Sequence, residues 1–265
     1  MTEPNAPAAV TVEVDADGIS VVTLNRPTAM NAMNGELVEG LRAIFHAMNA
    51  RADVRVIILT GAGDRAFCVG ADLKERGGMS ETEVQQRLRD YRVALRALET
   101  VNKPVICAIN GYALGGGLEI ALACDIRIVA DEAQVGLTEL RLGVIPGAGG
   151  TQRLPRIVGI ARAKELIFRA ARLSAAEAVD VGLASQAAPR ADLLEAARAM
   201  AVEIAKSAPI ALAQAKTAIA AGMQVDLETG LELEAQAYAS TLATADRLEG
   251  LAAFAEKRAP RWQGK

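Results

Sequence analysis

Histidine is almost absent from this sequence: His46 is the only one in 265 residues. It lies between Phe45 and Ala47 in a stretch with helical spacing, where a surface or half-buried position is the ordinary explanation. Catalysis of the Ser-His-Asp or Cys-His type needs a histidine base held against its nucleophile. The sequence therefore argues against most enzymes of these two classes.

Cysteines are few, and their spacing is not that of a paired motif. Cys68, Cys107 and Cys124 form no CxxC motif, and no second metal ligand follows His46 after one helical turn. Zinc sites and disulfide frameworks both depend on such spacings. We therefore expect neither a bound metal nor a fold held by disulfides.

The sequence also lacks an excess of basic residues and any long apolar run. The net charge of −3 and the isoelectric point near 5.5 do not give the basic footprint that nucleic-acid binding usually requires. The stretch Met1–Val10 has no Lys or Arg and no apolar core of signal-peptide length, and no later run reaches the ~18 apolar residues that cross a bilayer. We expect a soluble, unexported, cytoplasmic protein.

Aliphatic residues supply most of the apolar content. Hydrophobic residues make up 51% of the chain but aromatic residues only 3%, and there are 23 glycines. This composition indicates an aliphatic core with many glycine turns, and the length fits one α/β core with an appended segment.

The first half of the chain alternates strand-like and helix-like segments. The β-branched runs at 10–15 and 19–24 flank a glycine turn, which predicts a β-hairpin. Asn34 is a candidate helix cap, and Ser80 with Glu83 is a candidate capping box. In chain order we then expect a helix at 34–50, a strand at 55–60, a helix at 80–101, a strand at 104–109, a short helix at 118–124 and a strand at 126–130. This repetition predicts stacked ββα-like turns in an α/β fold.

Strand signals disappear from Ala161 onward. Gly182, Pro209 and Gly222 separate segments with helical patterns. The expected helices are 161–171, 174–181, 191–206, 209–221, 226–242 and 245–258. We therefore expect a core domain at 1–190 and a helical C-terminal region at 191–265.

One glycine motif has to be set aside. Gly61, Gly63 and Ala66 follow a strand and match the GxGxxA fingerprint of dinucleotide-binding proteins. Gly70 falls where the helix of that motif should continue, and no preceding βα unit supplies the acidic residue of the fingerprint. A nicotinamide site is therefore not expected.

Glu119 is an anomalous carboxylate. It follows three glycines and has apolar neighbours on every side of its short helix, from Leu118 to Ala123. Such a side chain faces the interior or a cleft, where burial raises its pKa toward the range useful for proton transfer. The alternative from this segment alone is an acid that offsets the dipole of the first helical turn.

A second carboxylate, Glu139, stands among Leu137, Leu140 and Leu142. Taken alone, it fits a helix start or the surface at least as well as a functional site. Two acids in apolar surroundings could nevertheless divide the work of activating a water and delivering a proton, with each role set by the environment.

Four longer segments carry a family resemblance: FCVGADL at 67–73, GYALGGGLE at 111–119, TELRLGVIPGAGGTQRL at 138–154 and DRLEGLAAFAEKR at 246–258. Together they resemble the crotonase (enoyl-CoA hydratase/isomerase) family from about Val10 to Lys257. The resemblance implies a crotonase-type superhelix of ββα turns with a helical C-terminal trimerisation region. It also implies that Glu119 and Glu139 are the two catalytic glutamates.

By the same resemblance, the backbone N–H groups of Ala71 and Gly116 form an oxyanion hole for the thioester oxygen. Fixed donors, one of them at a helix N-terminus, stabilise the enolate character that develops when C3 is attacked. The glycines Gly115–Gly117 would keep Cβ atoms away from the acyl group, although close helix-strand packing also explains them. Gly147 is implied to lie near the attacking water.

The resemblance further implies coenzyme A contacts. Val69 would line the adenine pocket and Lys74 would meet phosphates, while Lys257, with Tyr238 nearby in space, would come from a neighbouring subunit. Thr28 stands where many relatives have a lysine, so phosphate binding there is weaker or falls to Arg26. The complete set of expected contacts is Arg26, Val69, Asp72, Leu73, Lys74, Tyr238 and Lys257.

The implied reaction is syn addition of water to a 2-enoyl-CoA, giving a 3-hydroxyacyl-CoA, as in fatty acid β-oxidation. Coenzyme A is part of the substrate, so no separate cofactor is expected, and the implied assembly is a homotrimer or a hexamer of two trimers. Glu119 would take a proton from the water and Glu139 would protonate C2, although the sequence alone leaves the reverse assignment open. A 3,2-enoyl-CoA isomerase needs one acid only, and the presence of Glu119 argues against it.

The segments 71–84, 163–168 and 222–231 most resemble the AU-binding methylglutaconyl-CoA hydratase branch, which raises leucine breakdown as a pathway. Animal members of that branch bind RNA through a lysine-rich early helix. This chain has no lysine before Lys74, so RNA binding is a weak alternative.

Overall fold

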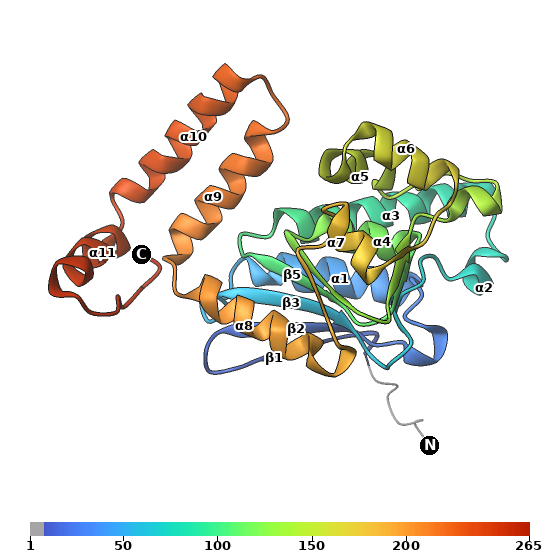
Figure 1. The fold of residues 1–265 in the computed structure, drawn as a ribbon, viewed down its shortest axis with the longest axis horizontal. Helices are drawn as coiled ribbons and strands as arrows, with labels where there is room; N and C mark the ends of the chain where they lie inside the picture. Colours follow the sequence, from blue (N-terminus) through green and yellow to red (C-terminus); the bar gives the residue numbers. More distant parts are fainter. Residues whose placement is uncertain (1–7) are drawn as a thin grey trace.

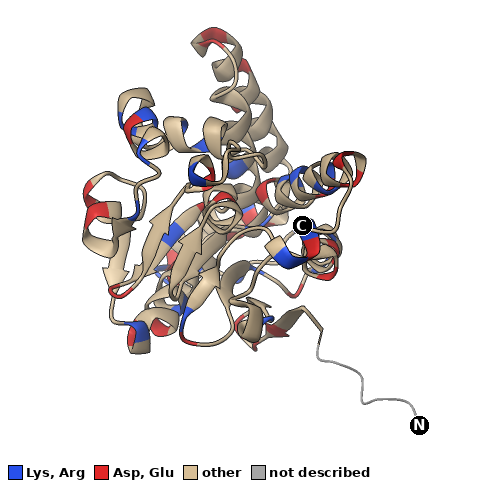
Figure 2. Ribbon diagram, turned by 90° about the vertical axis from the view of Figure 1, so that its right-hand side faces the viewer, with Lys and Arg blue, Asp and Glu red and all other residues tan. Residues whose placement is uncertain are grey.

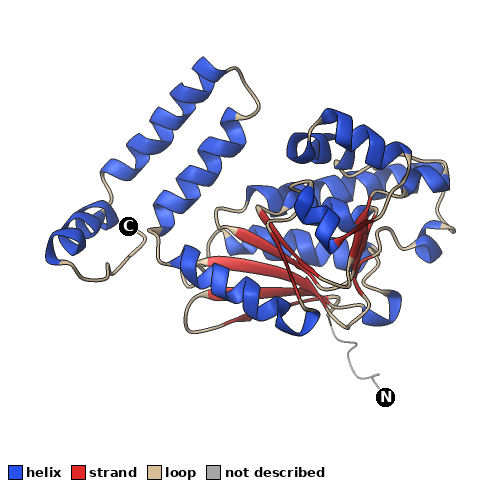
Figure 3. Cartoon of the chain, in the orientation of Figure 1, coloured by secondary structure: helices blue, strands red, loops and turns tan. Residues whose placement is uncertain are grey.

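The structure, a computed structural model, describes residues 8–265, so most of the Met1–Val10 stretch lies outside the described residues. Two β-sheets are packed among helices, and a separate arm of helices projects from this core (Figures 1 and 3). In the part of the chain that is described, none of the helices combines the length and the apolar character needed to cross a bilayer.

The first sheet has six strands in the order β1-β2-β3-β5-β7-β10. Its strands are β1 (Val10–Val14), β2 (Ile19–Leu24), β3 (Val56–Gly61), β5 (Val105–Ile109), β7 (Ile126–Ala130) and β10 (Gln186–Ala188). β1 and β2 form the expected antiparallel hairpin, and the remaining pairs are parallel. All five residues of β5 are buried, as expected for an apolar strand covered on both faces.

The second sheet has four short strands in the order β4-β6-β8-β9. They are β4 (Ala66–Cys68), β6 (Tyr112–Leu114), β8 (Gln134–Gly136) and β9 (Leu173–Ser174). A strand of this sheet follows each of β3, β5 and β7, and helical structure comes next in the chain. The expected ββα turns are therefore present.

Helices enclose the two sheets (Figure 1). They include α1 (Gly35–Met48), α2 (Leu73–Arg76), α3 (Glu81–Thr100), α4 (Gly116–Ala123), α5 (Gly150–Val158), α6 (Ile160–Phe168) and α7 (Ala175–Asp180), with 3-10 turns η1 (Pro27–Ala29), η2 (Glu139–Leu142) and η3 (Arg190–Asp192). Asn34 caps α1 by accepting from the Leu37 N–H, and Ser80 and Glu83 form the expected capping box of α3. Both predicted helix starts are confirmed.

The expectation that strands end before Ala161 was wrong. β9 closes an edge of the second sheet, and β10 pairs in parallel with β7 in the first. The sequence of β10, Gln-Ala-Ala, has little strand propensity, so its conformation depends on pairing with β7 and not on local preference.

α8 (Leu193–Ala205) lies on the first sheet, with Ala197 and Ala201 fully buried. The helical C-terminal region expected at 191–265 therefore includes α8, which packs on the core, and a projecting arm that begins after α8. The arm consists of α9 (Pro209–Gly222), α10 (Leu227–Leu242) and α11 (Ala245–Glu256), of which α9 and α10 lie side by side (Figure 1).

The C-terminal tail fastens the arm to the end of α8. Asp246, which is 2% exposed, accepts hydrogen bonds from the N–H groups of Gln263 and Gly264 at 2.6 and 2.9 Å. The indole of Trp262 donates to the carbonyl of Lys206 at 2.6 Å. The tail therefore holds α11 against the junction between α8 and α9.

Candidate active site

One cleft brings together most of the residues expected to act in the reaction. It is lined by the loop before α2, the start of α4, the segment after β8, and parts of α3, α5 and α9. Its lining includes Ala71, Gly116, Glu119, Glu139 and Gly147. Groups of three or more His, Cys, Asp and Glu side chains suited to a metal ion are not found among residues 8–265.

Glu119 lies in the first turn of α4, a helix in which every residue is buried. Its side chain is 3% exposed, and its Oε1 accepts hydrogen bonds from the backbone N–H groups of Ala148 at 2.8 Å and Gly150 at 2.7 Å. Burial raises the pKa of Glu119, whereas these two donors and the nearby Arg153 and Arg92 lower it. The expected interior carboxylate is confirmed, and its charged form has specific partners.

The loop at 147–149 is held so that the N–H groups of Ala148 and of the next helical residue, Gly150, face Glu119. Its three carbonyls are each bound from other directions: Gly147 by the Arg92 Nε at 3.1 Å, Ala148 by the Arg153 Nη1 at 2.9 Å, and Gly149 by backbone N–H groups of α5. Gly149 has φ of +112°, a backbone conformation that residues other than glycine rarely adopt. The loop is therefore a rigid cradle for one carboxylate oxygen.

Glu139 begins the η2 turn and has a different environment. Its Oε2 is buried and, within residues 8–265, has no hydrogen-bond partner. Burial raises the pKa of Glu139 to about 7, and the negative charge of Glu119 adds to this, while the backbone N–H of Glu139 acts in the opposite direction. Glu139 therefore holds a proton at a pH where an ordinary glutamate has lost it.

The backbone N–H groups of Ala71 and Gly116, both residues of the cleft, have no acceptor in the described part of the chain. Gly116 is the first residue of α4, so its N–H is one of the free donors of a helix N-terminus. Gly70 lies against it, because a Cβ on Gly70 would come within 3.0 Å of the Gly116 nitrogen. Two neighbouring free donors in a cleft can bind one developing oxyanion.

A side chain at each of the three glycines at 115–117 would meet a different neighbour. A Cβ on Gly117 would lie 1.9 Å from the Cys68 carbonyl oxygen, and one on Gly116 would lie 2.2 Å from the Met33 methyl. These two positions require close packing between α4 and its neighbours. A Cβ on Gly115 would lie 3.1 Å from the Glu139 carboxylate, so this glycine leaves room at the site itself.

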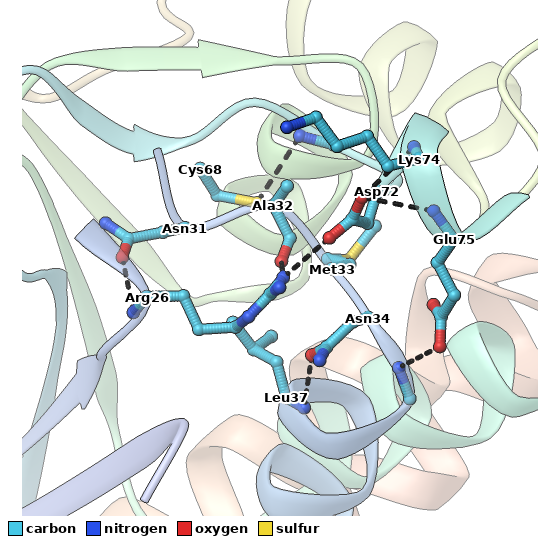
Figure 4. Close-up of polar contacts among 12 residues, drawn as sticks. Arg26, Asn31, Ala32, Met33, Asn34, Leu37, Cys68, Asp72, Lys74 and Glu75 are labelled. Atoms are coloured by element: carbon cyan, nitrogen blue, oxygen red, sulfur yellow. Dashed lines mark hydrogen bonds and ion pairs between the residues drawn. The ribbon is translucent and has the colours of Figure 1, made fainter. Parts of the chain in front are cut away.

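The structure divides the expected coenzyme A contacts into groups. Val69 and Leu73 line the cleft, and Lys74 is exposed in the first turn of α2. Arg26 and Asp72 pair with each other at 3.0 Å, and Arg26 Nη1 also donates to the carbonyl of Ala32 (Figure 4). Asp72 also caps α2 by accepting from the Lys74 and Glu75 N–H groups. This pair is thus engaged in joining the segment after β2 to the start of α2.

Tyr238 and Lys257 lie on the arm, on α10 and at the end of α11, and both are exposed. Neither is among the residues that line the cleft of a single chain. Their expected contact with coenzyme A across a subunit boundary stays a prediction.

Several residues that position the Glu119 carboxylate were not predicted from the sequence. Ala148 and Gly150 act through backbone N–H groups, which leave no side-chain signal, although the GAGG run does signal a tight loop. Arg92 lies in the expected helix at 80–101, and Arg153 lies in α5, a segment for which no helix was expected. Only the fold brings them to the loop at 147–149.

The fold thus brings two carboxyl groups with unequal surroundings and two free backbone N–H groups to one cleft. Residues 15–265 match the family model described as enoyl-CoA hydratase/isomerase. The chain therefore belongs to the enoyl-CoA hydratase/isomerase (crotonase) family, whose members act on acyl-CoA thioesters.

Individual relatives cover nearly the whole chain. The putative enoyl-CoA hydratase/isomerase YngF of Bacillus subtilis is 46% identical, over 95% of this chain and 96% of its own. The human mitochondrial methylglutaconyl-CoA hydratase is 45% identical, over 96% of this chain and 76% of its own. The crystal structure of an enoyl-CoA hydratase from Bacillus anthracis has a TM-score of 0.95 and 49% identity, covering 97% of this chain and all of that one. These likenesses confirm the expected crotonase-type fold.

Proposed function

We propose that this protein is an enoyl-CoA hydratase that adds water in a syn manner across the 2,3 double bond of a 2-enoyl-CoA, giving a 3-hydroxyacyl-CoA. The observation that carries the proposal is the pair of glutamates with unequal environments in one cleft. Glu119 has two backbone donors for its charged form, whereas the buried Glu139 Oε2 has none. Such a difference separates a base from an acid.

In the proposed reaction, the Glu119 carboxylate accepts a proton from the water that attacks C3. The Glu139 carboxyl group, whose pKa is raised to about 7, donates its proton to C2. After the reaction Glu119 carries one proton more and Glu139 one proton fewer than before. Transfer of one proton from Glu119 to Glu139, directly or through solvent, restores the starting state of the enzyme. Both acids line the same cleft, which is what addition to one face of the substrate requires.

The free N–H groups of Ala71 and Gly116 would bind the thioester oxygen, which gains negative charge as water adds to C3. These donors are fixed by the backbone and need no rearrangement during the reaction. Proton transfer and oxyanion binding supply every step, so the proposed chemistry uses no metal and no cofactor beyond the coenzyme A of the substrate. The cytoplasmic location expected from the sequence belongs to the same proposal.

A panel of thioesters tests the proposal: crotonyl-CoA, longer 2-enoyl-CoA esters, 3-methylglutaconyl-CoA and a 3-enoyl-CoA. Loss of absorbance at the conjugated thioester band with a 2-enoyl-CoA is the expected result. The same loss with 3-methylglutaconyl-CoA as the best substrate would place the protein with its methylglutaconyl-CoA hydratase relatives.

The competing isomerase function gives the opposite signal. A 3,2-enoyl-CoA isomerase would produce the conjugated band from the 3-enoyl-CoA and would not consume crotonyl-CoA. That result would overturn the hydratase proposal while leaving the family assignment intact. Retardation of a labelled AU-rich RNA at low salt is the corresponding test of the RNA-binding alternative.

A further inference from the structure

We propose that Arg92 of α3 is a positioning residue for this reaction, because its guanidinium holds the Gly147–Ala148 peptide group with the Ala148 N–H aimed at Glu119. The inference rests on the proposed function, in which Glu119 is the base. It concerns a residue that makes no contact with the reacting carboxylates themselves and acts through one peptide unit.

The geometry forms a continuous chain of hydrogen bonds. Arg92 Nε donates to the Gly147 carbonyl oxygen at 3.1 Å, and the Ala148 N–H donates to Glu119 Oε1 at 2.8 Å. The C=O of residue 147 and the N–H of residue 148 belong to the same planar peptide, and in a trans peptide they point in opposite directions. A donor on the carbonyl therefore fixes the direction of the N–H and polarises it.

Arg92 differs from the other cation near Glu119. Three charged groups face this carboxylate: Arg92 from α3, Arg153 from α5 and Glu139 from η2. Arg153 is paired with Glu99 through two hydrogen bonds, at 2.9 and 3.2 Å. Within residues 8–265 Arg92 forms no ion pair, so its positive charge is not balanced by a carboxylate.

Arg92 and Arg153 therefore have different effects on the loop at 147–149. Arg153 binds the next carbonyl, that of Ala148, and is itself anchored by Glu99, so it mainly holds the loop in place. Arg92 holds the peptide whose N–H touches the base. Removing Arg92 should weaken the Ala148 donor, so Glu119 should bind its proton more tightly and lose activity at low pH.

The test is the pH profile of kcat/KM for crotonyl-CoA in Arg92→Leu, Arg92→Gln and Arg92→Lys. Its acid limb reports Glu119 and its basic limb reports Glu139 in the proposed mechanism. In the Leu and Gln variants we expect the acid limb to move up by about 0.5–1 pH unit, with a loss of roughly 3–10-fold below it and an unchanged basic limb. Lysine keeps a positive charge and a hydrogen-bond donor, so the acid limb of Arg92→Lys should move less than those of the Leu and Gln variants.

Arg89→Leu is the matched control, because it removes a charge one turn earlier on α3 and, within residues 8–265, the Arg89 side chain donates hydrogen bonds only to Gln86. It should leave both limbs in place. A uniform loss of kcat at every pH in the Arg92 variants would show a merely structural role and would overturn the inference. A change in KM alone would do the same, because it would make Arg92 a substrate contact.

A direct titration separates this inference from the proposed function. The carboxyl carbon of Glu119 can be followed by NMR in protein labelled with δ-¹³C glutamate, with the signal assigned by its loss in Glu119→Gln. An upward shift of its midpoint in Arg92→Gln supports the inference even if no thioester in the panel is hydrated. An unchanged midpoint overturns the inference even if crotonyl-CoA is a good substrate.

Discussion

Glu119 and Glu139 have identical side chains but differ in the partners of their charged forms. Two N–H donors at 2.7 and 2.8 Å stabilise the Glu119 carboxylate, and each such charge-assisted bond is worth roughly 1.5–3 kcal/mol. The Glu139 Oε2 has no donor among the described residues and shares the cleft with a negative neighbour. In the proposed mechanism, the surroundings of each glutamate, and not its residue type, decide which one is the base and which one is the acid.

The first prediction follows from this assignment. Glu119→Gln and Glu139→Gln should each lower the rate of crotonyl-CoA hydration by roughly 10²–10⁴-fold, because each removes one proton-transfer step and little shape. Binding of an acyl-CoA, measured by calorimetry, should be nearly unchanged. Glu132→Gln, an exposed substitution of the same kind, is the control. Near-normal turnover in either active-site variant would contradict the two-glutamate mechanism.

The second prediction concerns stability. In the folded protein Glu139 has a pKa of about 7, above its ordinary value of 4.5, so the folded state keeps the proton longer than the unfolded chain. The contribution of Glu139 to the free energy of unfolding is therefore fully present below about pH 4.5 and is lost as the pH rises through about 7. Glutamine cannot ionise and escapes this loss. Because Glu139 is only half-buried, solvent screening reduces the effect, and we expect about 1–2 kcal/mol.

Urea unfolding of the wild-type protein and of Glu139→Gln, at pH 5 and at pH 8, measures this difference. The free energy of unfolding of Glu139→Gln should rise relative to that of the wild type when the pH is raised from 5 to 8. Glu132→Gln should show no such gain. A constant difference between the two pH values would mean that Glu139 is not protonated more readily in the folded state.

At the scale of secondary-structure elements, the sequence predicts those parts whose signals are local. The caps at Asn34 and Ser80 mark the starts of α1 and α3, and the apolar run of β5 marks a buried strand. These signals rest on hydrogen bonds within four residues or on a continuous apolar stretch. Local chemistry is enough to place such elements.

Other elements were not predicted because their stability is not local. β4, β6 and β8 have three residues each, too few to show a period of two. α5 contains Pro155 and starts after Gly149, so its sequence has the composition of a loop. α5 nevertheless supplies Arg153 and the Gly150 N–H. Because this helix was not predicted, its contacts to Glu119 and to the loop at 147–149 were not predicted either.

On the scale of the whole molecule, the arm exposes an unusual amount of apolar surface. Met223, Leu227 and Phe254 are 73%, 78% and 86% exposed, and further apolar side chains on α9, α10 and α11 are exposed with them. Lys and Arg positions and Asp and Glu positions are both distributed over many parts of the ribbon (Figure 2). Large apolar patches usually mark contacts between subunits.

The third prediction is therefore that the protein is a trimer, or a hexamer of two trimers. Light scattering at micromolar concentration measures the mass directly. Phe254→Asp should shift the population toward smaller species, because it places a charge in the expected contact. Phe168, which is exposed on α6 of the core, offers Phe168→Asp as the comparison, and this variant should leave the assembly unchanged. A monomeric wild-type protein would contradict the prediction.

The last prediction links assembly to substrate binding through Lys257. This residue caps the end of α11 with φ of +54°, is exposed, and is not among the residues that line the cleft of its own chain. The family resemblance predicts that in a trimer it contacts the phosphates of a coenzyme A bound to a neighbouring subunit. Arg26 is already paired with Asp72, and Thr28 has no charge, so Lys257 should carry much of the attraction for those phosphates.

Lys257→Ala should then raise KM for crotonyl-CoA, more at low than at high ionic strength, with kcat little changed. A remote phosphate contact acts alike on the ground state and the transition state, and salt screens it. Lys164→Ala removes the same charge from the exposed face of α6 and should have no effect on KM. If KM is unaffected at low salt, or if a pantetheine thioester without those phosphates suffers as much as the coenzyme A ester, then Lys257 does not bind coenzyme A.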